Sequence, residues 1–500
     1  MSRSTWLSIS TVRSAKIRSI KLDTDTTTSL DRLAHAAARA GHVRGMAYGI
    51  VIADQLVHDS SVGVLGEGFT APDQNSLFRI ASMTKSFTAA AFLHARDGQL
   101  LALHDPVARY IPAINEWILP TTDSPPITLV QLLSMSSGLA TDDPWADRHL
   151  DIGDVELNAI IADGPLFACV PGEAFQYSNL GFGLLGQAFA NATGVRLQDY
   201  VSRHLLAPLG MHATVWQLSD SDLLLRAAQG NHTVDGAWLD EARPLGDGGI
   251  APMGGLWSTV SDLSRWIDFW CDAWPARDGV DRLPLSRASR REAQRVHTDL
   301  PLTISALADG HRVSPSGYGL GLRVTSDLRL GRVIDHSGGV PGFGSNMRWA
   351  ADHAVGIIAL ANERYADMAT LTADMLDVLA DQILASVTPR PCPPALRATC
   401  QRLVELLNNW DDQIADALFG DNVALDEPFA RRRAAAQTLI GDHGPLRLGD
   451  VIAHSNSSAT AVLVGERTQA RLHVLMSPLH TPQVQRYTVA NHPSPTVESQ

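Results

Sequence analysis

The stretch Phe78-Arg-Ile-Ala-Ser-Met-Thr-Lys-Ser-Phe87 places Ser82 and Lys85 three positions apart at the start of a predicted helix, Ala81–Leu100. Residues three apart on a helix share one face, with about 5–6 Å between their Cβ atoms. A serine hydroxyl is a poor nucleophile until a base takes its proton. An amine becomes that base only if its pKa falls from about 10.4 toward neutrality, which burial or a neighbouring cation can cause. The spacing therefore predicts a nucleophile and its base.

Lysine is rare in this chain. Only Lys16, Lys21 and Lys85 occur among 40 basic residues, and the others are arginine. Arginine stays charged and cannot serve as a base, whereas lysine can lose its proton when it is buried. The lysine at position 85 is therefore either one ordinary surface cation or an amine that has to titrate, and its neighbours favour the second interpretation.

Two further short motifs carry groups suited to acyl transfer. Tyr177-Ser-Asn179 follows Pro171-Gly172, and a tyrosine hydroxyl near a lysine can relay protons while an asparagine amide can hold a carbonyl group. His336-Ser-Gly-Gly339 lies at the end of a predicted strand, before an expected glycine turn. Glycine lets the backbone approach a ligand closely, and a strand-edge N–H can complete an oxyanion hole. Each motif alone is also typical of an ordinary turn or strand end.

Together these motifs resemble the serine β-lactamases and the penicillin-binding, DD-peptidase-type hydrolases, especially the class C-like branch with its esterases and D-amino-acid peptidases. The phrases Ile127-Thr-Leu-Val-Gln-Leu-Leu-Ser-Met-Ser-Ser-Gly-Leu139 and Gly254-Gly-Leu-Trp-Ser-Thr-Val-Ser-Asp-Leu263 belong to the same resemblance. The motifs occur in family order and cover about residues 45–365. The resemblance implies an α+β fold, an α/β sandwich of the β-lactamase/transpeptidase type.

The resemblance also implies a role for each motif residue. Ser82 would be the acylated nucleophile, and Lys85 and Tyr177 would share the general-base work, with the resting base left open. Asn179 would orient the carbonyl side of the substrate. The backbone N–H groups of Ser82 and Gly339 would form the oxyanion hole, and His336, Ser337 and Gly338 would stand where the family often has Lys-Thr-Gly.

This last departure bears on the substrate, which we expect to be a small ester, amide or peptide. A neutral histidine is a poor clamp for the carboxylate of β-lactams and peptidoglycan stem peptides. His336 therefore favours an esterase or a D-amino-acid peptidase. The alternatives are a DD-carboxypeptidase or penicillin-binding protein, a β-lactamase, or a catalytically silent binding or regulatory module on the same fold.

Composition excludes several other classes of protein. The 500 residues carry a net charge of −13, so we expect no nucleic-acid partner. No apolar run reaches membrane-spanning length, and the region 1–21 lacks the apolar core of a signal peptide, which makes the cytoplasm the expected location. The scattered cysteines form no CxxC pair, and neither His-Glu-x-x-His nor Gly-x-Ser-x-Gly occurs, so we expect no metal ion or cofactor.

Strand patterns at both ends of the main region bracket a helical middle. A helix capped by Ser29 is followed by strands at Met46–Ala53 and Leu56–Leu65. Residues 101–260 predict a mostly helical insertion. The later strands are Gly319–Val324, Arg332–Asp335, Phe343–Ala350 and Val355–Asn362, with a helix at Ala366–Ala385 after them. We expect one antiparallel sheet built from both chain ends and flanked by helices.

These patterns predict four segments. Residues 1–24 form a disordered tail, 25–388 a catalytic domain, 389–396 a proline-rich linker, and 397–500 a small α+β domain for which the sequence suggests no function. Within that last domain the pattern predicts helices over about 397–444 and four short strands over 445–490, including Ala459–Val464 and Ala470–Met476.

Overall fold

The computed structural model describes residues 22–491 apart from 69, 242–244, 308–309 and 387–391. The chain divides into two compact units, which meet in the sequence between Val387 and Thr388. We call them the N-terminal unit and the C-terminal unit. Most of the predicted tail, residues 1–21, lies outside the described part of the chain.

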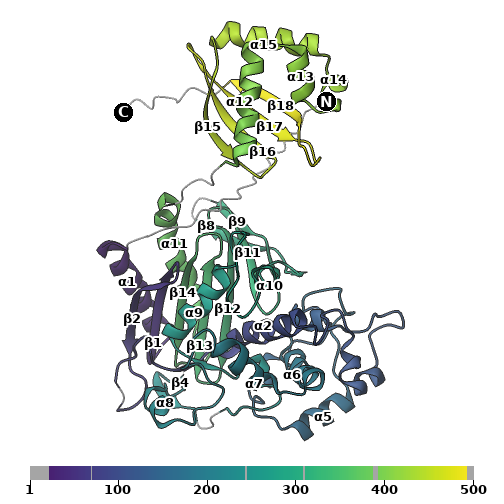
Figure 1. Cartoon of the computed structure of the whole chain (residues 1–500). Coiled ribbons are helices and arrows are strands. Elements are labelled where there is room, and N and C mark those ends of the chain that lie inside the picture. Colours follow the sequence, from purple (N-terminus) through teal and green to yellow (C-terminus); the bar gives the residue numbers. More distant parts are fainter. Residues whose placement is uncertain (1–21, 69, 242–244, 308–309, 387–391, 492–500) are drawn as a thin grey trace. The chain divides into compact units, whose positions relative to one another are not determined.

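The N-terminal unit is built around an eight-stranded antiparallel sheet with the strand order β2-β1-β14-β13-β12-β11-β10-β7 (Figure 1). β1 pairs with β14 along its length, so strands from the two ends of the unit lie side by side, as the sequence predicted. The sheet strands are β1 Gly45–Ile52, β2 Gln55–Gly63, β7 Thr298–Asp299, β10 Ser316–Tyr318, β11 Arg323–Asp327, β12 Gly331–Val340, β13 Phe343–Ala350 and β14 Val355–Ala361.

The central strands are buried on both faces because a helical layer covers each face. Along β1, Met46, Tyr48 and Ile50 belong to one core while Ala47 and Val51 belong to the other, as the period of two in a strand requires. The first core lies under α1 (Thr24–Ala40) and α11 (Met368–Ser386). The second lies under α9 (Val260–Cys271) and the buried helix α2 (Thr84–Asp97).

The segment between β2 and β7 contains the predicted helical insertion, 101–260, in which helices outnumber strands. This segment supplies Ser82 and one wall of the cavity over it. Its helices are α3 Leu129–Leu133, α4 Asp143–Ala146, α5 Asp154–Asp163, α6 Asn179–Thr193, α7 Leu197–Val201, α8 Ser221–Arg226 and α10 Arg287–Ala293, with α2 and α9. Its short turns of helix are η1 Ala81–Met83, η2 Val107–Arg109, η3 Pro112–Glu116, η4 Ser202–Leu206 and η5 Ala251–Met253. In the described part of the chain, three small strand pairs lie outside the eight-stranded sheet. Two are in this segment, β3 Phe78–Arg79 with β6 Trp257–Ser258 and β4 Asn231–Val234 with β5 Ala237–Asp240, and the third, β8 Thr303–Leu307 with β9 Gly310–Ser314, follows β7.

The C-terminal unit is a separate α+β module, as predicted. Its four-stranded antiparallel sheet has the order β15-β16-β17-β18 and its own hydrophobic core. On β16 and β17 every second residue is buried, which gives the sheet one core face. The elements are α12 Pro394–Asn408, α13 Asp412–Leu418, α14 Asp421–Asp426, α15 Phe429–His443, β15 Arg447–Ala453, β16 Ser458–Val464, β17 Gln469–Met476 and β18 Val484–Asn491.

Two predicted strands have different bounds in the structure. The prediction of a strand over Gly319–Val324 was wrong, because 319–322 form a tight turn between β10 and β11 in which Gly321 has φ +65°. A Cβ atom at Gly321 would stand 2.4 Å from the carbonyl oxygen of Lys85, so only glycine fits there. β12 continues to Val340, so His336–Gly339 lie inside this strand, and the turn follows at Gly342.

Two predicted boundaries were also wrong. α1 begins at Thr24, before the predicted cap Ser29, because the Asp23 side chain accepts the Thr26 N–H and caps the helix. The predicted tail therefore ends too late. At the predicted linker, residues 387–391 lie outside the described part of the chain, and α12 already begins at Pro394, since proline is tolerated in the first turn of a helix.

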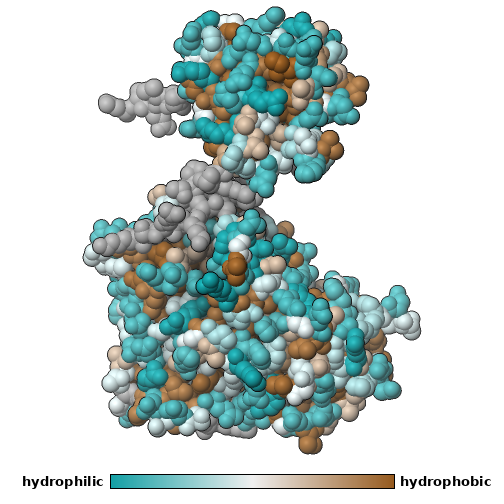
Figure 2. Space-filling model, viewed as in Figure 1, coloured by the Kyte–Doolittle hydropathy of each residue, from teal (hydrophilic) through white to brown (hydrophobic). Residues whose placement is uncertain are grey.

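Hydrophilic and hydrophobic residues are interspersed on the face of the N-terminal unit seen in Figure 2. Among the residues that the structure describes, no helix combines the length and the apolar character that crossing a membrane requires.

Candidate active site

Ser82 lies in the short turn η1, which the sheet holds in place directly before α2. The preceding residue, Ala81, has φ +47°, a left-handed conformation that a non-glycine residue rarely adopts. The Ser345 hydroxyl on β13 donates to the Ile80 carbonyl oxygen at 2.8 Å, and the Ile80 N–H donates to the Leu256 carbonyl oxygen at 3.1 Å. Contacts on both sides of Ile80 therefore fix the backbone that presents the Ser82 hydroxyl.

The Lys85 amine is fully buried and is surrounded by three oxygen atoms. Its Nζ lies 2.9 Å from Ser82 Oγ, 2.7 Å from Asn179 Oδ1 and 2.9 Å from the Met253 carbonyl oxygen. It also stands 4.8 Å from the ring centroid of Tyr177. The predicted helical spacing thus brings the amine into direct contact with the hydroxyl.

The electrostatic surroundings of Lys85 act in opposite directions. Burial lowers the pKa of the amine to about 8, while the carboxylates of Asp143, Asp147 and Asp142 raise it. The amine is therefore partly deprotonated near neutral pH. These three acids belong to none of the motifs recognised in the sequence, although they follow the Ile127–Leu139 phrase closely along the chain.

Asn179 begins α6 and is held at its backbone and at both ends of its amide. Asp142 accepts the N–H groups of Asn179 and Leu180 at 2.7 and 2.8 Å. Asp143 accepts from Asn179 Nδ2 at 2.6 Å, which directs Oδ1 toward Lys85. Since Asn179 is fully buried and its amide is engaged, the structure places it behind the nucleophile. Its predicted contact with substrate stays a prediction.

Tyr177 lies between the nucleophile and the third motif. Burial raises the pKa of Tyr177 well above its usual value, and the charge on Asp143 acts in the same direction. A hydrogen bond with Ser82 has the opposite, smaller effect on this pKa. The phenol is therefore protonated at neutral pH, and Lys85 is the better candidate for the resting base.

His336 is buried and its hydrogen bonds determine its tautomer. Nδ1 lies 2.6 Å from the Ser337 carbonyl oxygen, which can only accept, so Nδ1 carries the hydrogen. Burial and the Lys85 charge lower the pKa of His336 to about 3, so Nε2 is bare. The Tyr318 hydroxyl, 2.8 Å away, therefore donates to Nε2.

The two glycines of the third motif face different surroundings. A Cβ atom at Gly338 would stand 2.2 Å from the Ile80 carbonyl oxygen, so this glycine lets β12 pack against η1. Gly339 lines the cavity beside Ser82. Because β11 begins at Arg323, opposite Asp335, residues 336–340 of β12 have a paired strand on one side only within the described sheet. Gly339 on this free edge shares the cavity with Ser82.

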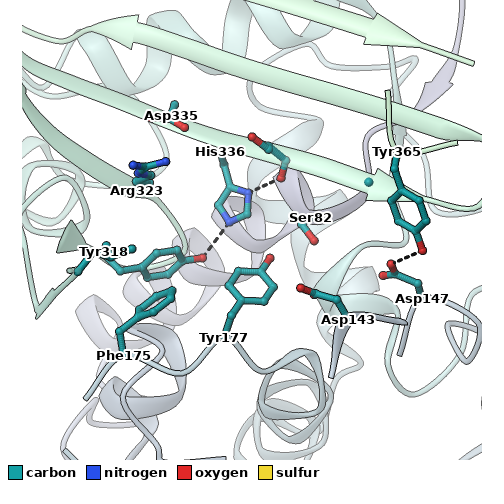
Figure 3. Close-up of a pocket in the computed structure, with 13 residues that line it drawn as sticks. Ser82, Asp143, Asp147, Phe175, Tyr177, Tyr318, Arg323, Asp335, His336 and Tyr365 are labelled. Atoms are coloured by element: carbon teal, nitrogen blue, oxygen red, sulfur yellow. Dashed lines mark hydrogen bonds between the residues drawn. The ribbon is translucent and has the colours of Figure 1, made fainter. Parts of the chain in front are cut away.

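A cavity of about 410 Å³ opens over Ser82. Figure 3 shows its two sides: Tyr177, Tyr318, His336 and Arg323 lie to one side of Ser82, and Asp143, Asp147 and Tyr365 lie to the other. The Tyr365 hydroxyl donates to Asp147 Oδ2 at 2.8 Å, and burial raises the pKa of Asp147 to about 7. The cavity is lined by Ser82, Asp143, Asp147, Phe175, Tyr177, Leu300, Tyr318, Arg323, Asp335, His336, Ser337, Gly339 and Tyr365.

Besides Asp143 and Asp147, the lining residues that the sequence motifs did not reveal include Tyr318, Arg323 and Tyr365. Tyr318 and Arg323 flank the glycine turn that had been assigned to a strand, and nothing in the sequence marks Tyr365. The Nε atom of Arg323 is buried and has no hydrogen-bond partner in the described part of the chain. The neighbouring carboxylate, Asp335, pairs instead with Arg348 at 3.3 Å. Among the residues that the structure describes, the Arg323 guanidinium group has no ion-pair partner, and it borders the cavity.

A sequence model described as Beta-lactamase matches residues 30–382 of this chain. The chain belongs to this family. The predicted family is therefore confirmed, and with it the coarser functional class, serine hydrolases on the β-lactamase fold.

Several relatives are 27–28% identical to this chain over the residues that align. AmpH, the D-alanyl-D-alanine-carboxypeptidase/endopeptidase of Escherichia coli K12, is 27% identical over 289 residues, which are 56% of this chain and 72% of that protein. Penicillin-binding protein 4* of Bacillus subtilis is 27% identical over 315 residues, 58% of this chain and 61% of its own. Beta-lactamase-like protein 2 of Dictyostelium discoideum is 28% identical over 259 residues, 49% of this chain and less than half, 46%, of its own length.

Solved structures confirm the fold. The octameric penicillin-binding protein homologue from Pyrococcus abyssi matches with a TM-score of 0.59 at 19% identity, covering 93% of this chain and 95% of its own. A class C beta-lactamase matches with a TM-score of 0.56 at 19% identity, covering 74% of this chain and 98% of its own. The predicted β-lactamase/transpeptidase-like α+β fold is therefore correct.

Proposed function

We propose that this protein cleaves a small amide, peptide or ester through an acyl-enzyme on Ser82. The proposal rests on the contact of 2.9 Å between Lys85 Nζ and Ser82 Oγ, in a buried position where the other two oxygen partners of the amine are Asn179 Oδ1 and the Met253 carbonyl. As a protonated amine, Lys85 donates one hydrogen to each of its three oxygen partners. As a neutral amine it keeps hydrogens for Asn179 Oδ1 and the Met253 carbonyl, which can only accept. Its lone pair then faces the Ser82 hydroxyl and can take the proton.

The proposed reaction needs only side chains and backbone groups of this protein and one water molecule. Ser82 Oγ bonds to the substrate carbonyl carbon as its proton passes to Lys85. Backbone N–H groups of Ser82 and Gly339 stabilise the oxyanion. The bond to the leaving group breaks as Tyr177 protonates the leaving atom and regains a proton from Lys85. Water then attacks the carbonyl carbon of the acyl-enzyme and gives a proton to Lys85. The bond between this carbon and Ser82 Oγ breaks as Lys85 returns the proton to Oγ, and the carboxylic acid leaves.

Arg323 favours a leaving group that carries a carboxylate. Tyr177, as the acid that protonates the leaving atom, puts the leaving group on its own side of Ser82, and Arg323 borders the cavity on that side (Figure 3). A guanidinium group can bind a carboxylate through two parallel hydrogen bonds. His336 is neutral and does not add a positive charge there. A short peptide with a free carboxyl end is therefore our first candidate substrate, in keeping with the name of the AmpH relative.

The test begins with a fluorophosphonate probe and mass spectrometry of the labelled protein. We expect one adduct on Ser82 and none in Ser82→Ala. An unlabelled wild-type protein that is still folded would instead support the catalytically silent binding module.

A hydrolysis panel then identifies the substrate class. It contains p-nitrophenyl acetate and butyrate, D-alanine and L-alanine p-nitroanilides, N-acyl-D-Ala-D-Ala with its C-terminal amide, and nitrocefin. Of the two dipeptides, we expect wild type to prefer N-acyl-D-Ala-D-Ala with a free carboxylate over its C-terminal amide. In Arg323→Gln the KM for the free carboxylate should rise about tenfold or more, while the KM for the C-terminal amide should change little. Turnover of the p-nitrophenyl esters alone would support the esterase, and turnover of nitrocefin the β-lactamase.

A further inference from the structure

Tyr318 presents its hydroxyl on the same side of the cavity as Tyr177, the side proposed for the leaving group. Tyr318 is 3% exposed and lies on β10, at the start of the glycine turn. Its ring centroid is 6.5 Å from that of Tyr177, at an interplanar angle of 86°. Figure 3 shows its hydroxyl directed toward His336 and toward the ring of Tyr177.

The hydrogen of this hydroxyl is already used. Nδ1–H of His336 donates to the Ser337 carbonyl oxygen at 2.6 Å, which leaves Nε2 to accept from Tyr318 at 2.8 Å. The Ser337 carbonyl oxygen can only accept a hydrogen bond, and this fixes the direction of both hydrogen bonds in the series Tyr318–His336–Ser337. The Tyr318 oxygen therefore offers only lone pairs to anything that enters the cavity.

We propose that Tyr318 is a specificity-determining residue that favours amide over ester substrates, because its oxygen accepts the N–H of an amide leaving group. This inference rests on the proposed acyl-enzyme function. Tyr177 protonates the leaving nitrogen, and the nitrogen's own N–H is free to donate to the Tyr318 oxygen. An ester has no hydrogen on its leaving oxygen, so the same position brings two sets of lone pairs together. A site that pairs with a substrate N–H rejects the analogue that lacks it.

His336 sets this preference indirectly, as a positioning residue. It does not touch the substrate in this proposal; it holds the Tyr318 hydrogen away from the cavity. Removing the imidazole would free the hydroxyl to rotate and to donate toward an ester oxygen.

The experiment compares two substrates that differ only at the leaving atom: the peptide N-acyl-D-Ala-D-Ala and the depsipeptide N-acyl-D-Ala-D-lactate. If wild type turns over neither, the p-nitroanilide and p-nitrophenyl ester of one acyl group replace them. In Tyr318→Phe we expect kcat/KM for the amide to fall about tenfold, the size of one hydrogen bond, relative to the ester. In His336→Leu we expect the same ratio to shift toward the ester.

Fluorophosphonate labelling of Ser82 is measured in both variants, so a loss of the nucleophile is recognised as such. If Tyr318→Phe is labelled and lowers amide and ester turnover by the same factor, the inference is wrong while the proposed function stands. If wild type is not labelled and turns over neither substrate of either pair, the proposed function fails first. An unchanged ratio in His336→Leu would overturn the positioning role of His336.

Discussion

At the scale of single residues, Tyr177 is the group whose role depends most on the leaving atom. Its phenol is protonated at neutral pH because burial raises its pKa. We expect Tyr177→Phe to slow hydrolysis of a peptide or an alkyl ester by about 10²–10⁴, the usual contribution of a general acid or base. A p-nitrophenolate leaves without a proton, so acylation by p-nitrophenyl acetate should slow much less. Equal losses in burst kinetics on both substrates would contradict the assignment.

Asp147 controls the titration of Lys85 from a distance. Its negative charge raises the pKa of the amine, so Asp147→Asn should lower that pKa. The rise of kcat/KM with pH should then occur at lower pH than in wild type. Asp123→Asn, at an exposed site, is the matched control and should leave the profile in place. A shift to higher pH in Asp147→Asn would contradict the sign of this interaction.

The sequence identified the residues that form short motifs and missed those that stand alone. Ser82, Lys85, Tyr177 and His336 each occur in a recognisable phrase, and the fold brings them together. Arg323 and Tyr365 have no local pattern, because their importance comes only from which strand or loop faces the cavity. Burial also decides the charge states of Lys85 and His336, and burial at one position depends on the whole fold.

At the scale of elements, the packing of β12 against η1 positions the nucleophile. Gly338→Ala would force a Cβ atom to within 2.2 Å of a backbone oxygen, that of Ile80. We expect it to lower the free energy of unfolding by about 1–3 kcal/mol, the usual range for overpacking, and to slow labelling of Ser82. Gly339→Ala meets the movable Tyr365 side chain at 2.7 Å and should lose less stability. Urea denaturation of both variants checks this, and an equal or larger loss in Gly339→Ala would contradict it.

Apart from the turn at 319–322, which had been predicted as a strand, the predicted elements of the sheet have the expected type and differ mainly in their bounds. Strand patterns near both ends of the N-terminal unit predicted the sheet, and β1 and β14, which are buried along their whole length, do pair side by side. The ends of β11 and β12 were predicted wrongly because neighbouring glycines in a sequence can mean either that a strand is interrupted or that another backbone packs closely against it. At Gly321 it marks a turn, and at Gly338 it marks close packing inside a strand.

At the scale of the whole molecule, each compact unit has its own hydrophobic core. We therefore expect residues 22–387 to fold and to label at Ser82 without the C-terminal unit. Residues 392–491 should also fold alone, because the sheet β15–β18 and its helices bury their apolar faces against each other. Thermal unfolding and labelling of the two fragments test this. An aggregated 22–387 fragment would contradict its independent folding. A folded fragment that is not labelled would show that the reaction requires both units.

The central claim is that the neutral Lys85 amine takes the Ser82 proton, and the pH dependence of Ser82 acylation tests it most directly. The measurement is the single-turnover rate of acylation by p-nitrophenyl acetate between pH 6 and 10, in wild type and in Lys85→Arg. The account predicts a wild-type rate that rises with pH to a plateau with a midpoint near the Lys85 pKa of about 8, because the fraction of neutral amine rises. In Lys85→Arg the rise should disappear and the rate should fall by about 10²–10⁴. A flat wild-type profile, or a Lys85→Arg variant that acylates as fast as wild type, would contradict it.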